Sequence, residues 1–174
     1  TGLIDSPKIR MLRGVHENDL VAELNSKIPA MLGTIIHEKL SSVPTPYPSV
    51  PEARLILEVD GWKISGQPDL VSLINDKVIL SDYKYTGEYS VRVGKIEWER
   101  QLNVYAYLIK HGVRIDTGDP LLLDEKPIEK INKLVVTAIL RDWKQRMAMR
   151  DPDYPQAWVV DMPLRLWSDV EQRE

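Results

Sequence analysis

Two stretches of the chain each place short apolar runs on either side of a polar pair that favours a turn. ARLILEVDGWKISG (53–66) turns at Asp60-Gly61, and DLVSLINDKVILSDYK (69–84) turns at Asn75-Asp76. Short apolar runs bounded by turn residues are typical of β-strands, and Asp-Gly is a strong hairpin signal. The pattern therefore predicts two β-hairpins in succession.

Helical patterns lie on both sides of these hairpins. Residues 20–40 predict a helix, in one piece or in two pieces with Pro29 opening the second, because proline is favoured at a helix start. Residues 95–110, KIEWERQLNVYAYLIK, predict a further helix that ends at Gly112.

Two other segments complete the order of elements. VPTPYPSVP (43–51) has four prolines, which predicts an extended connector because proline removes backbone donors and disfavours helix in the residue before it. INKLVVTAIL (131–140) is apolar and β-branched enough for a central strand. The order of helix, strands, helix and strand predicts an α/β fold, in which a mixed sheet is flanked by helices.

Composition narrows the class of protein. The 174 residues, 43% hydrophobic and 28% charged, fit a single domain over 1–174. The chain has no cysteine, which excludes disulfides, thiolate zinc sites, iron–sulfur clusters and a cysteine nucleophile. We expect a cytoplasmic protein, because no apolar run approaches the roughly 18 residues of a membrane span and the first residues do not resemble a signal peptide. The net charge of −3 argues against a general polyanion binder, so a nucleic-acid substrate would need a local basic surface or bound cations.

The second hairpin carries the candidate chemistry. With a two- or four-residue loop centred on Asn75-Asp76, Asp69 lies directly opposite Asp82, at a Cβ separation of about 4.5–5.5 Å. Two facing carboxylates call for a cation or a shared proton, and Mg²⁺ and Mn²⁺ prefer such oxygen ligands. Lys84 shares a face with Asp82 because strands have a period of two. The alternative is that Asp69 closes a turn and the other two form a surface pair; a three-residue loop would also separate the acids.

These residues resemble the PD-(D/E)XK motif of the restriction-endonuclease-like nucleases. The matching positions are Pro68-Asp69 and Asp82-Tyr83-Lys84. Gly33-x-x-x-His37 before the hairpin and Gln101-x-x-x-Tyr105 after it are similar to the RecB-like branch of that superfamily. On residue chemistry alone, His37 could equally be a satisfied core histidine and Gln101 a core polar contact. One departure is Tyr85, which intervenes between the lysine and Thr-Gly.

The resemblance implies a restriction-endonuclease-like fold and a metal-dependent DNA nuclease, most simply an exonuclease in recombination, repair or phage DNA processing. Asp69 and Asp82 would bind Mg²⁺ or Mn²⁺ with His37 and the carbonyl of Tyr83, and no iron–sulfur cluster is expected. The partner would be single-stranded DNA or DNA ends. No membrane partner is expected, and the protein could form a homo-oligomer. The alternatives are a non-catalytic nucleic-acid-binding module that retains the fold, and a site-specific endonuclease.

The same resemblance assigns the remaining catalytic roles. Lys84 would position or activate the attacking water, and Gln101 and Tyr105 would orient the lysine, a metal-bound water or the scissile phosphate. Beyond the lysine, a glycine-containing loop offers side chains that could grip a strand, or is simply an exposed loop of ordinary composition. These side chains are Tyr85, Tyr89, Arg92 and Lys95.

Other conspicuous side chains receive structural predictions. Glu38 is expected in solvent, and Glu58 in a structural or supporting role more than as a ligand of a second metal. Four tryptophans are predicted to pack in the core or at sheet edges: Trp62, Trp143, Trp158 and Trp167.

Overall fold

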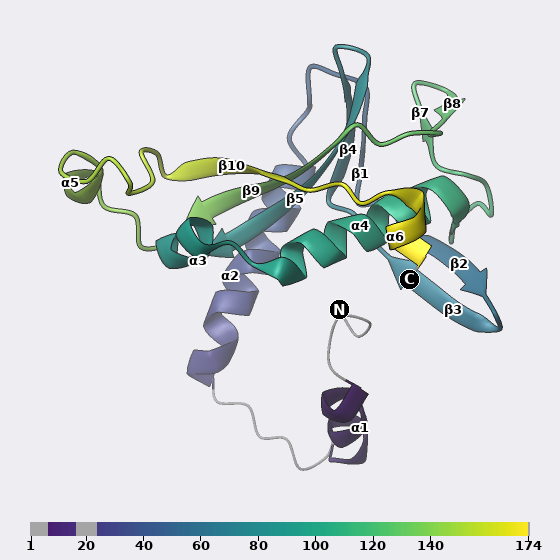
Figure 1. Cartoon of the computed structure of the whole chain (residues 1–174), viewed down its shortest axis with the longest axis horizontal. Helices are drawn as coiled ribbons and strands as arrows, with labels where there is room; N and C mark the ends of the chain where they lie inside the picture. The colour runs from purple at the N-terminus through teal and green to yellow at the C-terminus, as the bar shows by residue number, and fades with distance from the viewer. Residues whose placement is uncertain (1–6, 17–23, 174) are drawn as a thin grey trace.

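The computed structural model of the chain describes residues 7–16 and 24–173, drawn in colour in Figure 1. In chain order the elements are α1 (Pro7–Val15), α2 (Leu24–Ser41), β1 (Ser49–Pro51), β2 (Leu55–Val59), β3 (Trp62–Gly66), β4 (Leu70–Ile74), β5 (Lys77–Thr86), α3 (Glu88–Val93), α4 (Ile96–His111), β6 (Val113–Arg114), β7 (Leu122–Leu123), β8 (Lys126–Pro127), β9 (Lys133–Leu140), α5 (Gln145–Ala148), β10 (Val159–Leu164) and α6 (Asp169–Arg173).

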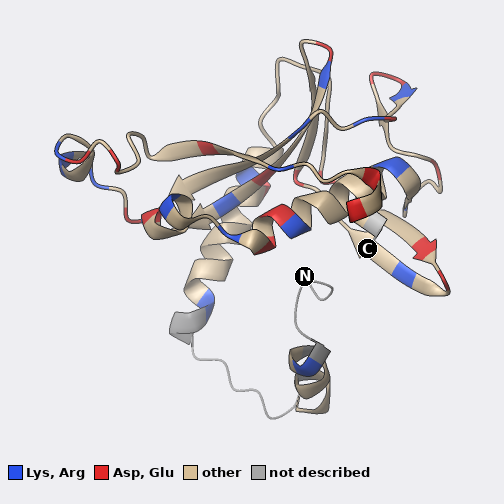
Figure 2. Ribbon diagram, in the orientation of Figure 1, with Lys and Arg blue, Asp and Glu red and all other residues tan. Residues whose placement is uncertain are grey.

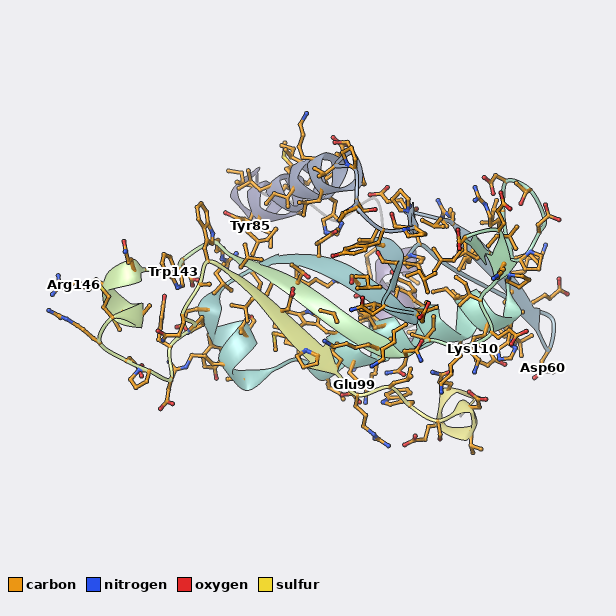
Figure 3. All side chains as sticks on the ribbon, turned by 90° about the horizontal axis from the view of Figure 1, so that it is seen from above. Asp60, Tyr85, Glu99, Lys110, Trp143 and Arg146 are labelled. Atoms are coloured by element: carbon orange, nitrogen blue, oxygen red, sulfur yellow. The ribbon has the colours of Figure 1, made fainter. Side chains whose placement is uncertain are left out.

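The main sheet has five strands in the order β1-β4-β5-β9-β10. Strands β5 and β9 run parallel, and the other neighbouring pairs are antiparallel, so the sheet is mixed. In Figure 3, which looks along the sheet from above, α2 lies on one side of it and the α4 residues Glu99 and Lys110 on the other. The predicted fold class, a mixed sheet flanked by helices, is therefore confirmed.

Both predicted hairpins form with two-residue turns. Asp60 and Gly61 have φ angles of 50° and 77°, and Asn75 and Asp76 have 52° and 59°. Positive φ at both central residues is the type I′ geometry that matches the twist of the flanking strands. In the second hairpin Ile74 pairs with Lys77, which fixes the register on which the argument about the two carboxylates depended.

The two faces of the main sheet differ in polarity, and α4 covers the apolar one. Strand alternation places a row of buried side chains on this face, and α4 packs its own buried residues against them. The sheet contributes Val71, Leu80, Leu134, Val136, Ala138 and Leu140, and the helix contributes Trp98, Leu102, Ala106, Leu108 and Ile109. Asp82 and Lys84 continue the same row beyond Leu80 and pair with the buried Val136 and Ala138 on β9, so these charged side chains border the core.

The helices answer one open prediction and depart from another. Of the two alternatives for residues 20–40, the structure shows the single helix, because α2 runs without interruption through Pro29. The predicted glycine-containing loop after the lysine is mostly the short helix α3, with Gly87 and Gly94 at its ends. Helix α4 ends at Gly112 as predicted. No helix in the described part of the chain is long and apolar enough to cross a membrane.

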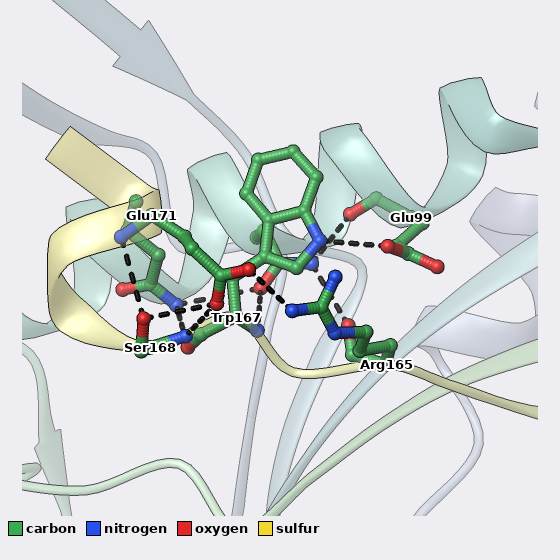
Figure 4. A network of polar contacts seen from close by, with 7 residues as sticks. Glu99, Arg165, Trp167, Ser168 and Glu171 are labelled. Carbon is green, nitrogen blue, oxygen red and sulfur yellow. Dashed lines mark hydrogen bonds and ion pairs between the residues drawn. The ribbon is translucent and has the colours of Figure 1, made fainter. Parts of the chain in front are cut away.

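A polar network ties the C-terminal segment to α4 (Figure 4). Trp167 Nε1 donates a hydrogen bond to Glu99 Oε1 (2.6 Å), and its backbone N–H donates to Asn103 Oδ1 (2.8 Å). The Asn103 amide in turn donates to the carbonyls of Glu99 (2.8 Å) and Arg165 (3.0 Å). Asn103 is 1% exposed, so this buried amide is satisfied by the segment that packs over it. The network thus fixes the C-terminal segment to α4, the helix that also carries Gln101 and Tyr105.

Candidate active site

Asp69 and Asp82 meet at the base of the second hairpin. The ladder pairs Leu70 with Ser81, and continuing it by one residue places Asp69 opposite Asp82. Asp69 Oδ2 accepts a hydrogen bond from the backbone N–H of Tyr83 (2.7 Å), which fixes this carboxylate against the neighbouring strand. The structure therefore brings together the two acids that the register argument paired.

Asp82 is the most buried acid of the site. Its residue is 1% exposed, and burial raises the pKa of its carboxyl from 3.8 to about 6. The Lys84 ammonium opposes this rise and the Asp69 carboxylate adds to it. Lys84 Nζ lies 2.6 Å from Asp82 Oδ2, but this buried oxygen has no partner of hydrogen-bond geometry among the described residues. The carboxylate therefore keeps acceptor capacity that a cation would use.

Lys84 is held from the other side by α4. Its Nζ donates to Gln101 Oε1 (3.1 Å), and Gln101 Nε2 donates to the Tyr105 hydroxyl (2.8 Å). Burial is the main cause that raises the pKa of Tyr105, so its hydroxyl stays protonated at neutral pH. Gly66 makes room for the ring, since a Cβ there would lie 2.7 Å from Tyr105 Cε1. The lysine is thus positioned by a chain of two side chains on one helix face.

His37 reaches the site from α2. Its Nδ1 lies 3.3 Å from Asp69 Oδ2, and its ring meets the Tyr83 ring edge-on with centroids 6.1 Å apart. The hydrogen bond to Asp69 is the main cause that raises the pKa of His37 above 6.5, against the effect of burial. His37 is therefore a polar neighbour of the acidic pair, not an isolated core histidine.

The residues fit a divalent cation by donor chemistry, although they do not form a closed cage. Within the described residues, no three His, Cys, Asp or Glu side chains converge as a metal site. The contacts run instead in pairs, His37 with Asp69 and Lys84 with Asp82. A hard cation prefers carboxylate and carbonyl oxygens, whereas an imidazole ligand is better suited to a transition metal than to Mg²⁺. Asp69, Asp82, His37 and the carbonyl of Tyr83 can supply that set.

The predicted substrate-contacting residues lie at the same end of the sheet but differ in accessibility. Tyr89 on α3 is 71% exposed, whereas Tyr85 is half-buried in β5. Arg92 pairs with Glu88 (3.9 Å), and Lys95 Nζ lies 5.4 Å from the Trp98 ring centroid. Tyr89, Arg92 and Lys95 are therefore exposed, and Tyr85 is the one candidate that is half-buried.

Other sequence predictions are corrected or answered by the structure. Trp62 and Trp158 are 77% and 62% exposed, so the prediction that they pack in the core or at edges is wrong for both. Glu38 is exposed as expected, and Glu58 lies on the separate β3-β2-β6 sheet, away from the paired acids.

Two residues that support the site were missed. Asn103 sits two positions after Gln101, on the opposite side of α4, and Gly66 lies three positions before Asp69. The available signal for Asn103 was a second amide side chain in the predicted apolar helix, two residues after Gln101. Gly66 gave none, because its role depends on how closely β3 approaches α4.

The fold and this constellation define a class of nucleic-acid-cleaving enzymes built on a mixed sheet with an acidic hairpin and a lysine. A family model described as the PD-(D/E)XK nuclease superfamily matches residues 8–160. The chain belongs to the PD-(D/E)XK nuclease superfamily. Membership indicates a metal-dependent nuclease, a hydrolase acting on nucleic acid, and such enzymes typically use divalent metal ions.

A solved structure supports the same fold. The structure described as the crystal structure of SSO0001 superposes with a TM-score of 0.61 at 18% sequence identity. The superposition covers 99% of this chain and 69% of that one. At this identity the likeness concerns the fold alone. No match is found among curated proteins.

Proposed function

We propose that this chain is a Mg²⁺- or Mn²⁺-dependent deoxyribonuclease of the RecB-like branch, acting as an exonuclease in DNA recombination, repair or phage DNA processing. The observation that carries the proposal is the position of Lys84 Nζ, 2.6 Å from Asp82 and 3.1 Å from Gln101, beside the Asp69–Asp82 pair. His37 and the Gln101–Tyr105 pair lie at this site as that branch would require.

Each residue has a defined task in the proposed reaction. Asp69 and Asp82 would hold the divalent ion, with His37 and the carbonyl of Tyr83 as further donors. When bound, such an ion offsets phosphate charge and lowers the pKa of a water molecule. Lys84 donates a hydrogen bond to the attacking water or to a phosphate oxygen that gains charge. Gln101 and Tyr105 fix the direction of that ammonium group.

The overall chemistry is hydrolysis of a phosphodiester. The water oxygen forms a bond to phosphorus as the bond from phosphorus to the leaving sugar oxygen breaks. The water loses one proton to solvent, and the leaving oxygen takes one up. Hydrogen-bond donors placed where charge develops contribute about 10²–10³-fold to such reactions.

A time course on end-labelled DNA tests the proposal. Purified protein with Mn²⁺ is incubated with linear and with circular single-stranded DNA of equal length, alongside a Lys84→Ala variant. We expect loss of the linear substrate, an intact circle, and no cleavage by the variant. Cleavage of the circle would show that the protein is an endonuclease and not an exonuclease. Equal rates for wild type and variant would overturn the enzymatic role in favour of a non-catalytic binding module.

A further inference from the structure

Residues 141–158 between β9 and β10 form a projecting segment, which we call the β9–β10 arm. Figure 1 shows it reaching past the end of the main sheet, with α5 at its tip. Trp143 Nε1 donates to the carbonyl of Pro155 (2.7 Å), and the Lys144 N–H donates to the Tyr154 hydroxyl (3.1 Å). Tyr154 is only 5% exposed. The arm therefore has a small packed interior of its own.

The base of the arm adjoins the strand that carries Lys84. The backbone N–H of Arg141 donates to the carbonyl of Thr86 (2.9 Å), two residues beyond the lysine. Asp142 Oδ1 accepts a hydrogen bond from the N–H of Glu88 (2.8 Å) at the start of α3. The arm is thus anchored to the strand that carries the proposed catalytic lysine and to the helix that follows it.

The arm carries four cations and three carboxylates, a net charge of +1 in a chain of net charge −3. All four cations lie in its first ten residues with one of the carboxylates, and Figure 2 shows both basic and acidic residues around the tip. The carboxylates Asp142 and Asp151 accept backbone N–H groups at the base and within the arm. Among the described residues none of the four cations has an ion pair, and Arg146 points away from the body in Figure 3. They are Arg141, Lys144, Arg146 and Arg150.

Large apolar side chains accompany these cations. Trp158 is 62% exposed at the end of the arm, and Met149 is 81% exposed near its tip. The N–H of Leu140 donates to the carbonyl of Trp158 (3.0 Å), and Leu140 pairs with Thr86 on β5. With strands about 4.8 Å apart and a rise of about 3.4 Å per residue, Trp158 lies about 12 Å from Lys84, backbone to backbone. An exposed indole thus stands close to the proposed cleavage point.

We propose that the β9–β10 arm binds single-stranded DNA on its way to the active site, with Trp158 stacking on a base and Arg146 and Arg150 on the phosphates. The proposal rests on the nuclease function proposed above. An exposed aromatic ring and unpaired cations on one segment form the combination that holds single strands, since unpaired bases expose a face for stacking and the backbone supplies the charge. A flush duplex offers the phosphates but no free base face along its length.

Binding measured without catalysis tests the arm. Fluorescence anisotropy in EDTA follows a labelled 20-nucleotide single strand over a range of salt concentrations. Arg146→Gln/Arg150→Gln is compared with Arg54→Gln/Lys126→Gln, which removes two exposed cations away from the arm. We expect the arm variant to bind about tenfold more weakly and its salt slope to fall by about 1.4, because each phosphate contact contributes about 0.7. The control should match wild type.

The stacking role has a separate spectroscopic readout. Trp158→Leu is compared with Trp62→Leu, which removes another exposed indole, on β3. We expect only the first to weaken single-strand binding, by about tenfold, and to lose part of the indole fluorescence quenching caused by DNA. Thermal melts of all variants check that the fold is intact.

The outcomes separate this proposal from the proposed enzymatic function. If the arm variants bind like wild type, the arm is not a DNA-binding surface, even if wild-type protein cleaves DNA. If a blunt-ended duplex binds as tightly as the single strand, and Trp158→Leu weakens both affinities equally, the single-strand assignment is wrong. If Lys84→Ala cleaves as fast as wild type, the catalytic proposal fails while the binding measurements still decide the arm.

Discussion

Lys84 and Asp82 form an ion pair in which Nζ lies 2.6 Å from Oδ2, and the carboxylate belongs to a residue that is only 1% exposed. Alternation along β5 places both side chains on the face that α4 covers. The pair therefore stands at the boundary between the hydrophobic core and the proposed reaction site. Removing the Lys84 ammonium would raise the pKa of Asp82 further, because this cation lowers it in the folded protein.

Removal of the lysine should abolish activity without unfolding the protein. Lys84→Ala takes away the donor proposed to act on water or phosphate, so we expect kcat to fall by at least about 100-fold. Lys77→Ala is the matched control, because Lys77 is exposed at the turn end of the same strand. Rates on end-labelled DNA measure both variants. A comparable loss in Lys77→Ala would point to a general effect of the charge and not to catalysis.

Gln101 should act as a positioning residue. Gln101→Ala removes the acceptor 3.1 Å from Lys84 Nζ and the donor to Tyr105, so the ammonium gains rotational freedom. We expect kcat to fall by about tenfold with KM nearly unchanged, because the lost interaction orients a group and does not hold substrate. Arg100→Ala, an exposed neighbour on α4, serves as control. A rise in KM at constant kcat would instead assign Gln101 to substrate binding.

The buried Asp82 carboxyl should lower the free energy of unfolding when it is ionised and not when it is protonated. Its folded-state pKa, about 6, lies above the usual 3.8, so the cost of burying the charge is fully present above about pH 6 and disappears below about pH 4. In EDTA, Asp82→Asn should therefore raise the free energy of unfolding at pH 7.5 by about 3 kcal/mol. The gain should shrink as pH falls towards 4.

Urea unfolding of both proteins at several pH values measures this difference. The same variant should lose nuclease activity, since an amide replaces the carboxylate proposed to bind the cation. A stabilisation that stays constant with pH would show that the burial of charge is not its cause.

The hairpin and the pairing of its two acids were predictable because they depend on local rules. Asn75-Asp76 specifies a two-residue turn, the turn fixes the register, and the register brings Asp69 opposite Asp82. Pro29 marks a limit of such rules. A proline can begin a helix or lie within its first two turns, and the local sequence does not distinguish the two cases. Helix α3 formed from residues that read as a loop, with Gly87 preceding it and Asp142, far along the chain, accepting the N–H of Glu88.

Residues whose role depends on distant partners were not predictable. Gly66 matters only because β3 packs against Tyr105, and Asn103 only because the segment around Trp167 folds back on α4. Trp158 was predicted to pack because tryptophan usually does, yet its neighbours in the fold leave it exposed. Local sequence carries no information about which elements meet at these positions.

Gly66 should tolerate no side chain. In Gly66→Ala the new Cβ would lie 2.7 Å from Tyr105 Cε1 and 2.8 Å from Leu108 Cδ1, both in the packed interior. Overpacking of this kind costs about 1–3 kcal/mol and should also displace the hydroxyl that Gln101 contacts. Gly33→Ala in α2 is the control for stability, as no atom lies within 4 Å of its Cβ position and alanine favours helix. Thermal unfolding and kcat are measured together, and an unchanged kcat in Gly66→Ala would show that the ring position is not critical.

Asn103 should be the polar group whose loss most weakens the attachment of the C-terminal segment. Asn103→Leu leaves the Arg165 carbonyl and the Trp167 N–H without their side-chain partner. Asn103 is 1% exposed, so water has little access to this position. Unsatisfied buried groups cost about 1–3 kcal/mol each, so we expect the free energy of unfolding to fall by about 2–4 kcal/mol. Asn132→Leu is the matched control. Its amide also accepts a backbone hydrogen bond, from Val78 at 2.8 Å, but in an exposed position where water can replace it. Urea unfolding should show a loss below about 1 kcal/mol for the control, and equal losses in the two variants would contradict the importance of burial at Asn103.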